Sequence, residues 1–380
     1  MNPALRTFPF TFIAATTMSA ASQLLFIGTY TPKESESRGI YVVRLDSETG
    51  ALSPPVLAAA TPNPTFLALN PDRPIVYALD ESEANEGKRG GAAAAFTYAD
   101  PSGKLSLLNL QSAGGENAAY IGIDPAGRTL VTISYHGGQI TSFPLTPDGK
   151  IGPRRSFITS TGTLGPRSDR QDRPHPHSVT YSPDNRFAYV CDLGRDKILR
   201  FRLDSASATL TPAGDFTTAP GAGPRHSKFS ADGRFLYVIN ELNGTIAVYD
   251  CDPSTGDLKA RQTVGTLPED FKESNTTAEI RIHPNGRFVY GSNRGHDSLA
   301  VFARNSTDGT LTRIQIVSSG GVQPRNFNLS PDGNWLVCAN RESNNLVVFK
   351  VDAKTGQLTA TGHQATVPQA VCVLFAPDAK

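Results

Sequence analysis

The chain has 380 residues, which is enough for one large domain or for two or three small ones. Its 36 Lys and Arg residues balance 35 Asp and Glu residues, so it lacks the basic excess of a nucleic-acid-binding protein. The sequence contains no run of 18 apolar residues, which excludes a membrane-spanning helix, and four cysteines are too few for a disulfide scaffold.

Residues 1–21 are distinct from the repeating part of the chain. Arg6 precedes a mildly apolar stretch, residues 8–18, and small residues follow at positions 19–21. This is the outline of a secretory signal peptide, but Pro9 and three threonines weaken its apolar core. Two alternatives remain: a signal peptide of a periplasmic or secreted protein, and an N-terminal extension of a cytoplasmic one.

From Leu24 onward, the chain repeats a pair of apolar strands joined by a tight turn. Typical turns are Ser182–Asn185 and Ser330–Gly333, with the sequences SPDN and SPDG. Proline presets φ for a turn, Asp or Asn bonds to its own backbone, and glycine adopts positive φ. The residues at the second position of the six turns lie 47 to 58 positions apart: Pro71, Pro125, Pro183, Ala231, Pro284 and Pro331.

Each repeat continues with two further strands. A third apolar strand follows the pair, as at residues 245–249 and 298–302, and a less regular fourth strand comes after it. Four short strands in about 50 residues are typical of a β-propeller blade. Six blades are complete, and the seventh combines a C-terminal strand (370–375) with the first strands of the repeating part. We therefore predict an all-β fold, one seven-bladed propeller over residues 22–380, closed by strands from both termini.

Several short motifs stand out along the propeller repeat. They are Phe26–Thr31, Gly39–Tyr41, Pro176–Ser178, Gly223–His226, Asn240–Leu242 and Gln323–Phe327. In this order, they resemble the lactonase family of seven-bladed propellers, which includes propeller-type 6-phosphogluconolactonase, and the resemblance covers nearly the whole chain. The related carboxymuconate cyclase shares the fold, so the family leaves the substrate open.

The candidate site lies at one mouth of the central channel. The start of the first strand and the end of the second strand of every blade reach this mouth. When the repeats are aligned on their turns, His177, Arg225 and Arg325 share the first position. The second position holds Glu81, Glu241, Arg294 and Arg341, with Tyr30 in the split blade. The four arginines outnumber the two glutamates, which predicts a positive surplus and an anionic substrate.

The resemblance to the cyclase assigns the catalytic trio to His177, Arg225 and Glu241, with Arg294 as a further site residue. For lactone hydrolysis we expect His177 to be the general base. Glu241 would orient it or hold sugar hydroxyls, and Arg225 would stabilise the oxyanion.

The remaining site predictions concern binding. Arg294 and Arg325 would bind phosphate through forked donors. His226 lines the pocket or packs within its strand, and Arg341 is a substrate contact or a surface residue. His175 and His177 form a His-x-His pair, but Pro176 between them and the lack of a third ligand argue against a metal.

The sequence therefore predicts a sugar-lactone hydrolase, most specifically one for 6-phosphoglucono-1,5-lactone. A lactonising cyclase and a non-enzymatic binding or scaffold propeller are the alternatives. The sequence contains no Gly-x-Ser-x-Gly elbow, phosphate-binding loop or dinucleotide fingerprint, so we expect no cofactor. The expected partner is a small anionic lactone, with no nucleic acid or membrane, and we expect a monomer.

Overall fold

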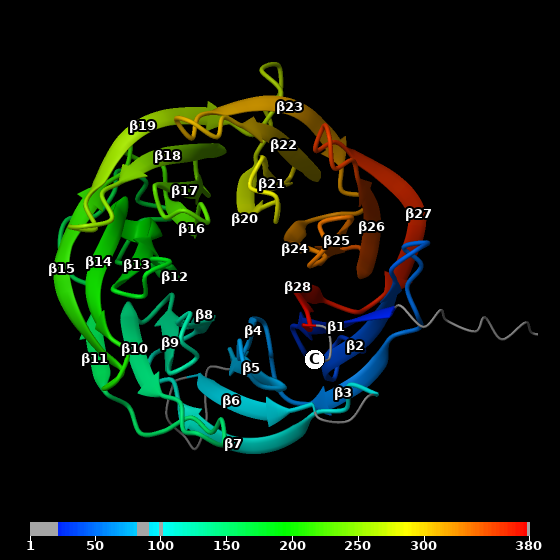
Figure 1. The fold of residues 1–380 in the computed structure, drawn as a ribbon, viewed down its shortest axis with the longest axis horizontal. Helices are drawn as coiled ribbons and strands as arrows, with labels where there is room; N and C mark the ends of the chain where they lie inside the picture. The colour runs from blue at the N-terminus through cyan, green and yellow to red at the C-terminus, as the bar shows by residue number, and fades with distance from the viewer. Residues whose placement is uncertain (1–21, 82–90, 99–101, 378–380) are drawn as a thin grey trace, which may run out of the picture.

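The computed structural model describes residues 22–81, 91–98 and 102–377. They form a ring of seven four-stranded antiparallel sheets around a central channel, which confirms the predicted propeller (Figure 1). The possible signal peptide, residues 1–21, lies outside the described residues. In the described part of the chain, no helix is long and apolar enough to cross a membrane.

Blade 1 is built from both ends of the repeating part of the chain. Its strands, from the channel outward, are β28 (Ala370–Phe375), β1 (Ser22–Thr29), β2 (Gly39–Asp46) and β3 (Val56–Ala60). In β28, Val373 pairs with Ile27 of β1, so the C-terminal strand is the innermost one and closes the ring. The predicted split blade is thus confirmed.

The other six blades follow in chain order, each with its first strand at the channel. Blade 2 contains β4 (Leu67–Leu69), β5 (Ile75–Asp80), β6 (Ala92–Thr97) and β7 (Ser106–Ser112). Blade 3 contains β8 (Ala118–Ile123), β9 (Thr129–Ser134), β10 (Gln139–Pro144) and β11 (Ser156–Thr159). Blade 4 contains β12 (Pro176–Tyr181), β13 (Phe187–Asp192), β14 (Lys197–Asp204) and β15 (Thr209–Thr217). Blade 5 contains β16 (Pro224–Phe229), β17 (Phe235–Asn240), β18 (Thr245–Cys251) and β19 (Leu258–Gly265). Blade 6 contains β20 (Thr276–Ile282), β21 (Phe288–Arg294), β22 (Ser298–Arg304) and β23 (Leu311–Ser318). Blade 7 contains β24 (Pro324–Leu329), β25 (Trp335–Asn340), β26 (Asn345–Val351) and β27 (Leu358–Thr366). A 3₁₀ turn, η1 (Leu193–Arg195), follows β13.

The turn between the first two strands of a blade is held by its own side chains. The Ser182 hydroxyl donates to Asp184 at 2.6 Å and accepts the backbone N–H of Phe187 at 3.0 Å. The serine that begins the corresponding turn in blades 5 and 7 makes the same two bonds. Gly233 adopts a φ of +71°, which a glycine takes without strain. These bonds explain why the motif recurs.

Neighbouring blades are joined by buried aromatic side chains of the second strands. Tyrosine hydroxyls donate to the carbonyl of a glycine in the outer hairpin of the next blade, at 2.7–3.0 Å: Tyr77 to Gly149, Tyr189 to Gly256, Tyr237 to Gly309 and Tyr290 to Gly356. In blade 7 the indole N–H of Trp335 donates to Ser47 of blade 1 at 3.1 Å. The closing contact of the ring therefore follows the same plan as the internal ones.

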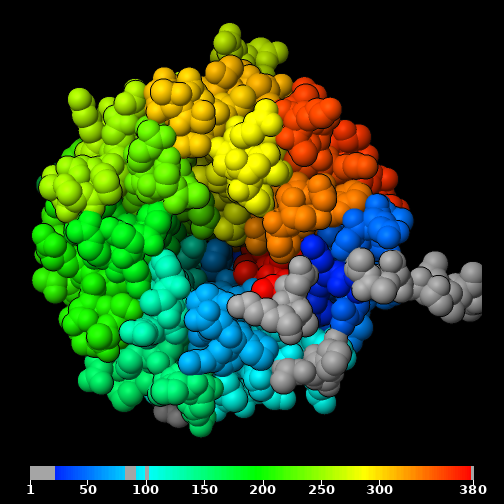
Figure 2. Space-filling model, viewed as in Figure 1, coloured from blue at the N-terminus to red at the C-terminus, as the bar shows by residue number. Residues whose placement is uncertain are grey.

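The apolar core lies between the faces of adjacent blades. One cluster joins Leu25 and Val373 of blade 1 to Val337 and Leu346 of blade 7, and all four side chains are buried. The innermost strands are left to surround the channel, and Figure 2 shows the disc hollowed at its centre. This arrangement leaves the channel mouth free for polar side chains.

Candidate active site

An extra residue near the start of several innermost strands supplies the first set of site residues. Pairing with the second strand is interrupted between Pro176 and Ser178, between Pro224 and His226, and between Pro324 and Asn326. The residues inside these bulges are His177, Arg225 and Arg325. A β-bulge re-aims the side chain of the extra residue, and these three side chains face cavities of the channel.

The ends of the second strands supply the second set. Glu81, Tyr135 and Glu241 directly follow β5, β9 and β17, and Arg294 ends β21. Together with the bulge residues His177 and Arg325, they line a cavity of about 540 Å³ at the mouth. The structure therefore brings His177, Glu241, Arg294 and Arg325 to one site, as their aligned positions predicted.

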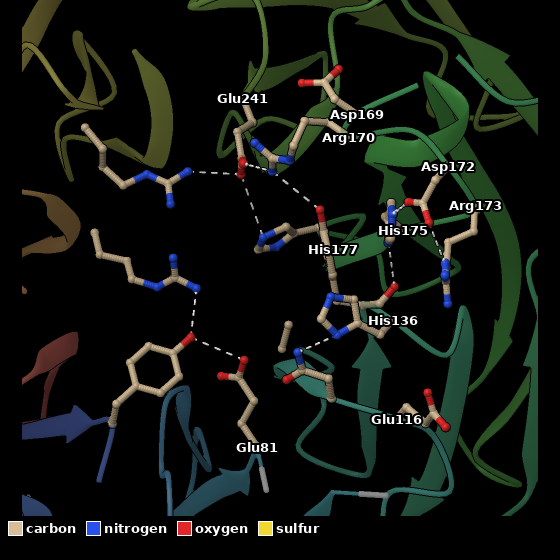
Figure 3. A pocket seen from close by; sticks show the side chains of 16 residues that line it. Glu81, Glu116, His136, Asp169, Arg170, Asp172, Arg173, His175, His177 and Glu241 are labelled. Carbon is tan, nitrogen blue, oxygen red and sulfur yellow. Dashed lines mark hydrogen bonds and ion pairs between the residues drawn. The ribbon is translucent and has the colours of Figure 1, made fainter. Parts of the chain in front are cut away.

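Glu241 is the electrostatic centre of this cavity (Figure 3). Its carboxylate accepts hydrogen bonds from Arg170 at 2.5 Å and Arg225 at 2.8 Å, and Arg294 lies 3.0 Å away. The side chain is only 5% exposed. A buried carboxylate is stable when it is paired and hydrogen-bonded, and three guanidinium groups meet that condition here.

The same contacts fix the ionisation state of Glu241 and His177. Burial opposes ionisation of Glu241, but Arg294 and Arg225 hold its pKa well below the usual value. Burial and the positive charge of Arg225 lower the pKa of His177 well below 6.5. Glu241 is therefore a carboxylate at neutral pH, and His177 is a neutral imidazole that can accept a proton. The His177 Nε2 lies 4.0 Å from a Glu241 oxygen.

Arg225 and His226 do not line the main cavity. The Arg225 side chain is 3% exposed, and its Nε–H and Nη1–H groups donate to Glu241 and to the carbonyl of Ala278. His226 is also buried, with Nε2 at 3.1 Å from Arg225 and Nδ1 at 3.3 Å from Glu279. Both residues border a second, much smaller cavity, and His177 lines this cavity and the main one. Arg225 is thus placed to hold Glu241.

On the opposite side of the cavity, Tyr30 links two charged residues. Arg325 Nη2 donates to the Tyr30 hydroxyl at 3.0 Å, and that hydroxyl donates to Glu81 at 3.2 Å. Arg341 lies over the Tyr30 ring, 4.9 Å from its centroid, and its Nε–H donates to Gln369. Arg341 does not line the main cavity. Its role as a substrate contact stays a prediction, and its observed contacts support the Tyr30 ring.

The loop between β11 and β12 contributes Arg170, Asp172 and Arg173, which sequence reasoning missed, and His175, which it considered only as a metal ligand. Arg170 reaches Glu241, and His175 stacks on Tyr135 with ring centroids 4.2 Å apart. Asp172 accepts from His175 at 2.9 Å and from Arg173 at 2.9 Å. The sequence did contain a signal for these site residues, because Asp169–Arg173 is a charged run in a long connection between blades. This run lies outside the repeat, so the alignment of blades gave it no position.

The loop changes the expected charge of the site. The main cavity is lined by four arginines, Arg170, Arg173, Arg294 and Arg325, and by five acidic residues, Glu81, Glu116, Asp169, Asp172 and Glu241. The predicted positive surplus is therefore wrong for the lining as a whole. Positive charge is concentrated locally at Arg294 and Arg325 of adjacent blades 6 and 7, and of these two Arg294 is paired with Glu241.

His175 and His177 do not form a metal site with their neighbours. Both ring nitrogens of His175 are engaged, Nδ1 with the Tyr135 carbonyl and Nε2 with Asp172, each at 2.9 Å. Within residues 22–81, 91–98 and 102–377, no group of three His, Cys, Asp or Glu side chains is arranged to hold a metal ion. The arrangement instead combines a neutral imidazole with a paired carboxylate and guanidinium donors.

Comparisons with known proteins agree with the fold and extend over nearly the whole chain. Residues 24–375 match the family model described as lactonase, seven-bladed beta-propeller. A 6-phosphogluconolactonase of Bacillus subtilis is 37% identical over 350 residues, which cover 92% of this chain and 97% of that protein. A 6-phosphogluconolactonase of Formosa agariphila is 34% identical, over 88% of this chain and 94% of the relative. The structure of a periplasmic gluconolactonase from Pseudomonas aeruginosa superimposes with a TM-score of 0.87 at 31% identity, covering 94% of this chain and 99% of the other. The chain belongs to the lactonase family of seven-bladed β-propellers.

Proposed function

We propose that this protein hydrolyses a sugar δ-lactone, with 6-phosphoglucono-1,5-lactone as its substrate. The observation that carries the proposal is the neutral His177 beside the arginine-paired Glu241 in a 540 Å³ cavity. Membership of the lactonase family and the names of the curated relatives support the choice of reaction.

In the proposed mechanism, His177 removes a proton from the attacking water as that water adds to the lactone carbonyl carbon. General-base catalysis by a positioned histidine contributes about 10²–10⁴ to the rate. Glu241 lies close enough to stabilise the imidazolium that forms, and its own position is fixed by Arg225.

The negative charge that develops on the carbonyl oxygen needs donors inside the cavity. The Nε and Nη1 atoms of Arg225 are engaged with Glu241, His226 and the Ala278 carbonyl, and Arg225 does not line the main cavity. Arg294 lines the cavity, so we assign the oxyanion to Arg294 and a supporting role to Arg225. Arg325 is the candidate donor to the phosphate, because it lines the cavity on the adjacent blade.

An unphosphorylated gluconolactone is the second candidate substrate. The five acidic residues of the lining disfavour a dianion over part of the cavity, and carboxylates are suitable acceptors for sugar hydroxyls. The structurally similar gluconolactonase of P. aeruginosa favours the same candidate.

The test is a substrate panel with the purified protein. Proton release is followed from 6-phosphogluconolactone and gluconolactone, and ring closure is followed with cis,cis-muconate and its carboxylated form. We expect hydrolysis of a gluconolactone above the spontaneous rate and no reaction with the muconates. Cyclisation of a muconate without lactone hydrolysis would overturn the proposal in favour of a cyclase. No turnover of any member would favour a binding module.

A further inference from the structure

Glu81 is a second glutamate of the main cavity, and it lies in a different environment from Glu241. It follows β5 in blade 2, whereas Glu241 follows β17 in blade 5. Three blades is the largest separation possible in a ring of seven, so the two carboxyl groups enter the cavity from opposite sides. In Figure 3, His177 lies next to Glu241, on the side of Glu241 that faces Glu81.

The contacts of Glu81 form a short relay along the wall of the cavity. Arg325 donates to the Tyr30 oxygen, and Tyr30 directs its own hydrogen to Glu81 Oε1. Glu81 also borders the second, smaller cavity, together with His177 and Arg325. Glu81 therefore faces the space where a bound lactone would lie, and one of its oxygens is held in place by Tyr30.

Among the residues that the structure describes, no arginine forms an ion pair with Glu81 comparable to those of Glu241. The charged and ionisable groups around it are Tyr30 of blade 1, Arg325 and Arg341 of blade 7, and His177 of blade 4. Burial raises the pKa of Glu81 above its usual value, although Arg325 opposes the effect. Two carboxyl groups of one cavity with pKa values displaced in opposite directions are a common sign of acid and base roles.

We propose that Glu81 is the general acid of this site and protonates the ring oxygen as it leaves the lactone carbonyl carbon. The proposal rests on the lactone hydrolysis proposed above. Water adds to the carbonyl carbon and gives one proton to His177. The bond between that carbon and the ring oxygen then breaks, and the Glu81 proton passes to the ring oxygen. The products are a hydroxy acid, a His177 imidazolium and a Glu81 carboxylate, and transfer of the proton from His177 to Glu81 through water restores the site.

A general acid matters only when the leaving group is a poor one. Gluconolactone must expel an alkoxide, whereas dihydrocoumarin, also a six-membered lactone, expels a phenoxide that needs no proton. Glu81→Gln keeps the size of the side chain and its ability to accept the Tyr30 hydrogen. We expect this variant to lower kcat for gluconolactone by about 10²–10³ and to change kcat for dihydrocoumarin by less than about threefold.

The pH dependence gives a second readout. In the wild-type protein, kcat/KM for gluconolactone should fall as the pH rises through the pKa of Glu81, because the acid form is the active one. Glu81→Gln should lose this alkaline limb, and Glu81→Asp should restore it at reduced rate. Glu48→Gln, an exposed glutamate in the turn after β2, is the matched control and should behave like the wild type.

The outcomes separate this proposal from the one on which it rests. Equal losses on both lactones, or an alkaline limb that persists in Glu81→Gln, would show that Glu81 is not the acid while lactone hydrolysis stands. If the wild-type protein hydrolyses neither lactone, the proposed function fails and the role of Glu81 fails with it. Retained dihydrocoumarin hydrolysis by Glu81→Gln also shows that the variant is folded.

Discussion

Replacing Glu241 with glutamine tests whether one carboxylate holds the site together. The substitution keeps the shape of the side chain but removes the charge that faces Arg170, Arg225 and Arg294 at 2.5–3.0 Å. Arg225 and Arg294 would then be buried without their ion-pair partner. Removing one partner of a buried ion pair costs about 3–5 kcal/mol, so we expect a loss of stability of that size.

This loss can be converted into a melting temperature. Unfolding entropy is about 2.1 cal/mol/K per residue near 60 °C, which gives about 0.8 kcal/mol/K for 380 residues. A loss of 3–5 kcal/mol therefore lowers Tm by about 4–6 °C. Calorimetry of the purified variant measures the shift. The matched control is Glu342→Gln, because Glu342 is 47% exposed and 3.6 Å from Arg341. Surface pairs contribute about 0–1 kcal/mol, so its Tm should stay within about 1 °C.

Glu241→Gln should also alter the titration of His177. The negative charge of Glu241 favours the imidazolium form, so its removal lowers the pKa of His177 further. The acid limb of the kcat/KM profile should then move to lower pH, and any residual activity should persist further into acid. A variant with wild-type Tm and an unmoved acid limb would refute the central role given to Glu241.

Three further predictions concern substrate charge, pH and ring closure. Arg325→Ala should reduce any kcat/KM preference for phosphorylated over unphosphorylated gluconolactone by about tenfold or more, since a charged hydrogen bond contributes about 1.5–3 kcal/mol, whereas Arg294→Ala should lower kcat/KM on both lactones alike. Equal losses on both substrates in Arg325→Ala would show that Arg325 does not bind the phosphate. Burial lowers the pKa of His177 well below 6.5 and that of His226 to about 3. Below about pH 6.5 the two histidines therefore bind more protons in the unfolded chain than in the folded one. Stability measured by urea unfolding should then fall as the pH drops below 6.5, by up to about 1.4 kcal/mol per pH unit for each group, and a flat profile would contradict the buried neutral state. Deleting residues 370–380 removes β28 from blade 1 and should abolish the cooperative thermal transition, whereas an unchanged transition would contradict closure by this strand.

The fold could be predicted because its determinants are local and repeated. A turn such as Ser330–Gly333 carries its own hydrogen bonds, and six copies fix the phase of the strands on either side. That phase was enough to place His177 and Arg325 at one repeat position and Glu241 at another, both at the same mouth of the channel. The tyrosine contacts between blades were not predicted, because nothing in the sequence around a strand tyrosine indicates which carbonyl of the next blade accepts its hydrogen bond.

The parts of the site that sequence reasoning missed depend on contacts outside the repeat. Arg170 reaches Glu241 from a long connecting loop, and only the folded structure shows which residue that loop meets. Arg341 shares the position of Glu241 in the repeat, but its side chain turns to Gln369 and Gln323 behind the Tyr30 ring. The position of a residue in the repeat therefore predicted where along the channel its backbone lies. The direction of its side chain depends on the residues that it contacts in the folded structure.

The most direct measurement of the central claim is the rate of acid release from 6-phosphogluconolactone by the wild-type protein and by His177→Ala. The account predicts turnover well above the spontaneous rate for the wild type and a kcat lower by about 10²–10⁴ for the variant, the usual range for loss of a general base. A variant that retains wild-type turnover would remove His177 from the mechanism, and a wild-type protein no faster than the spontaneous reaction on this lactone or on gluconolactone would contradict the proposed function.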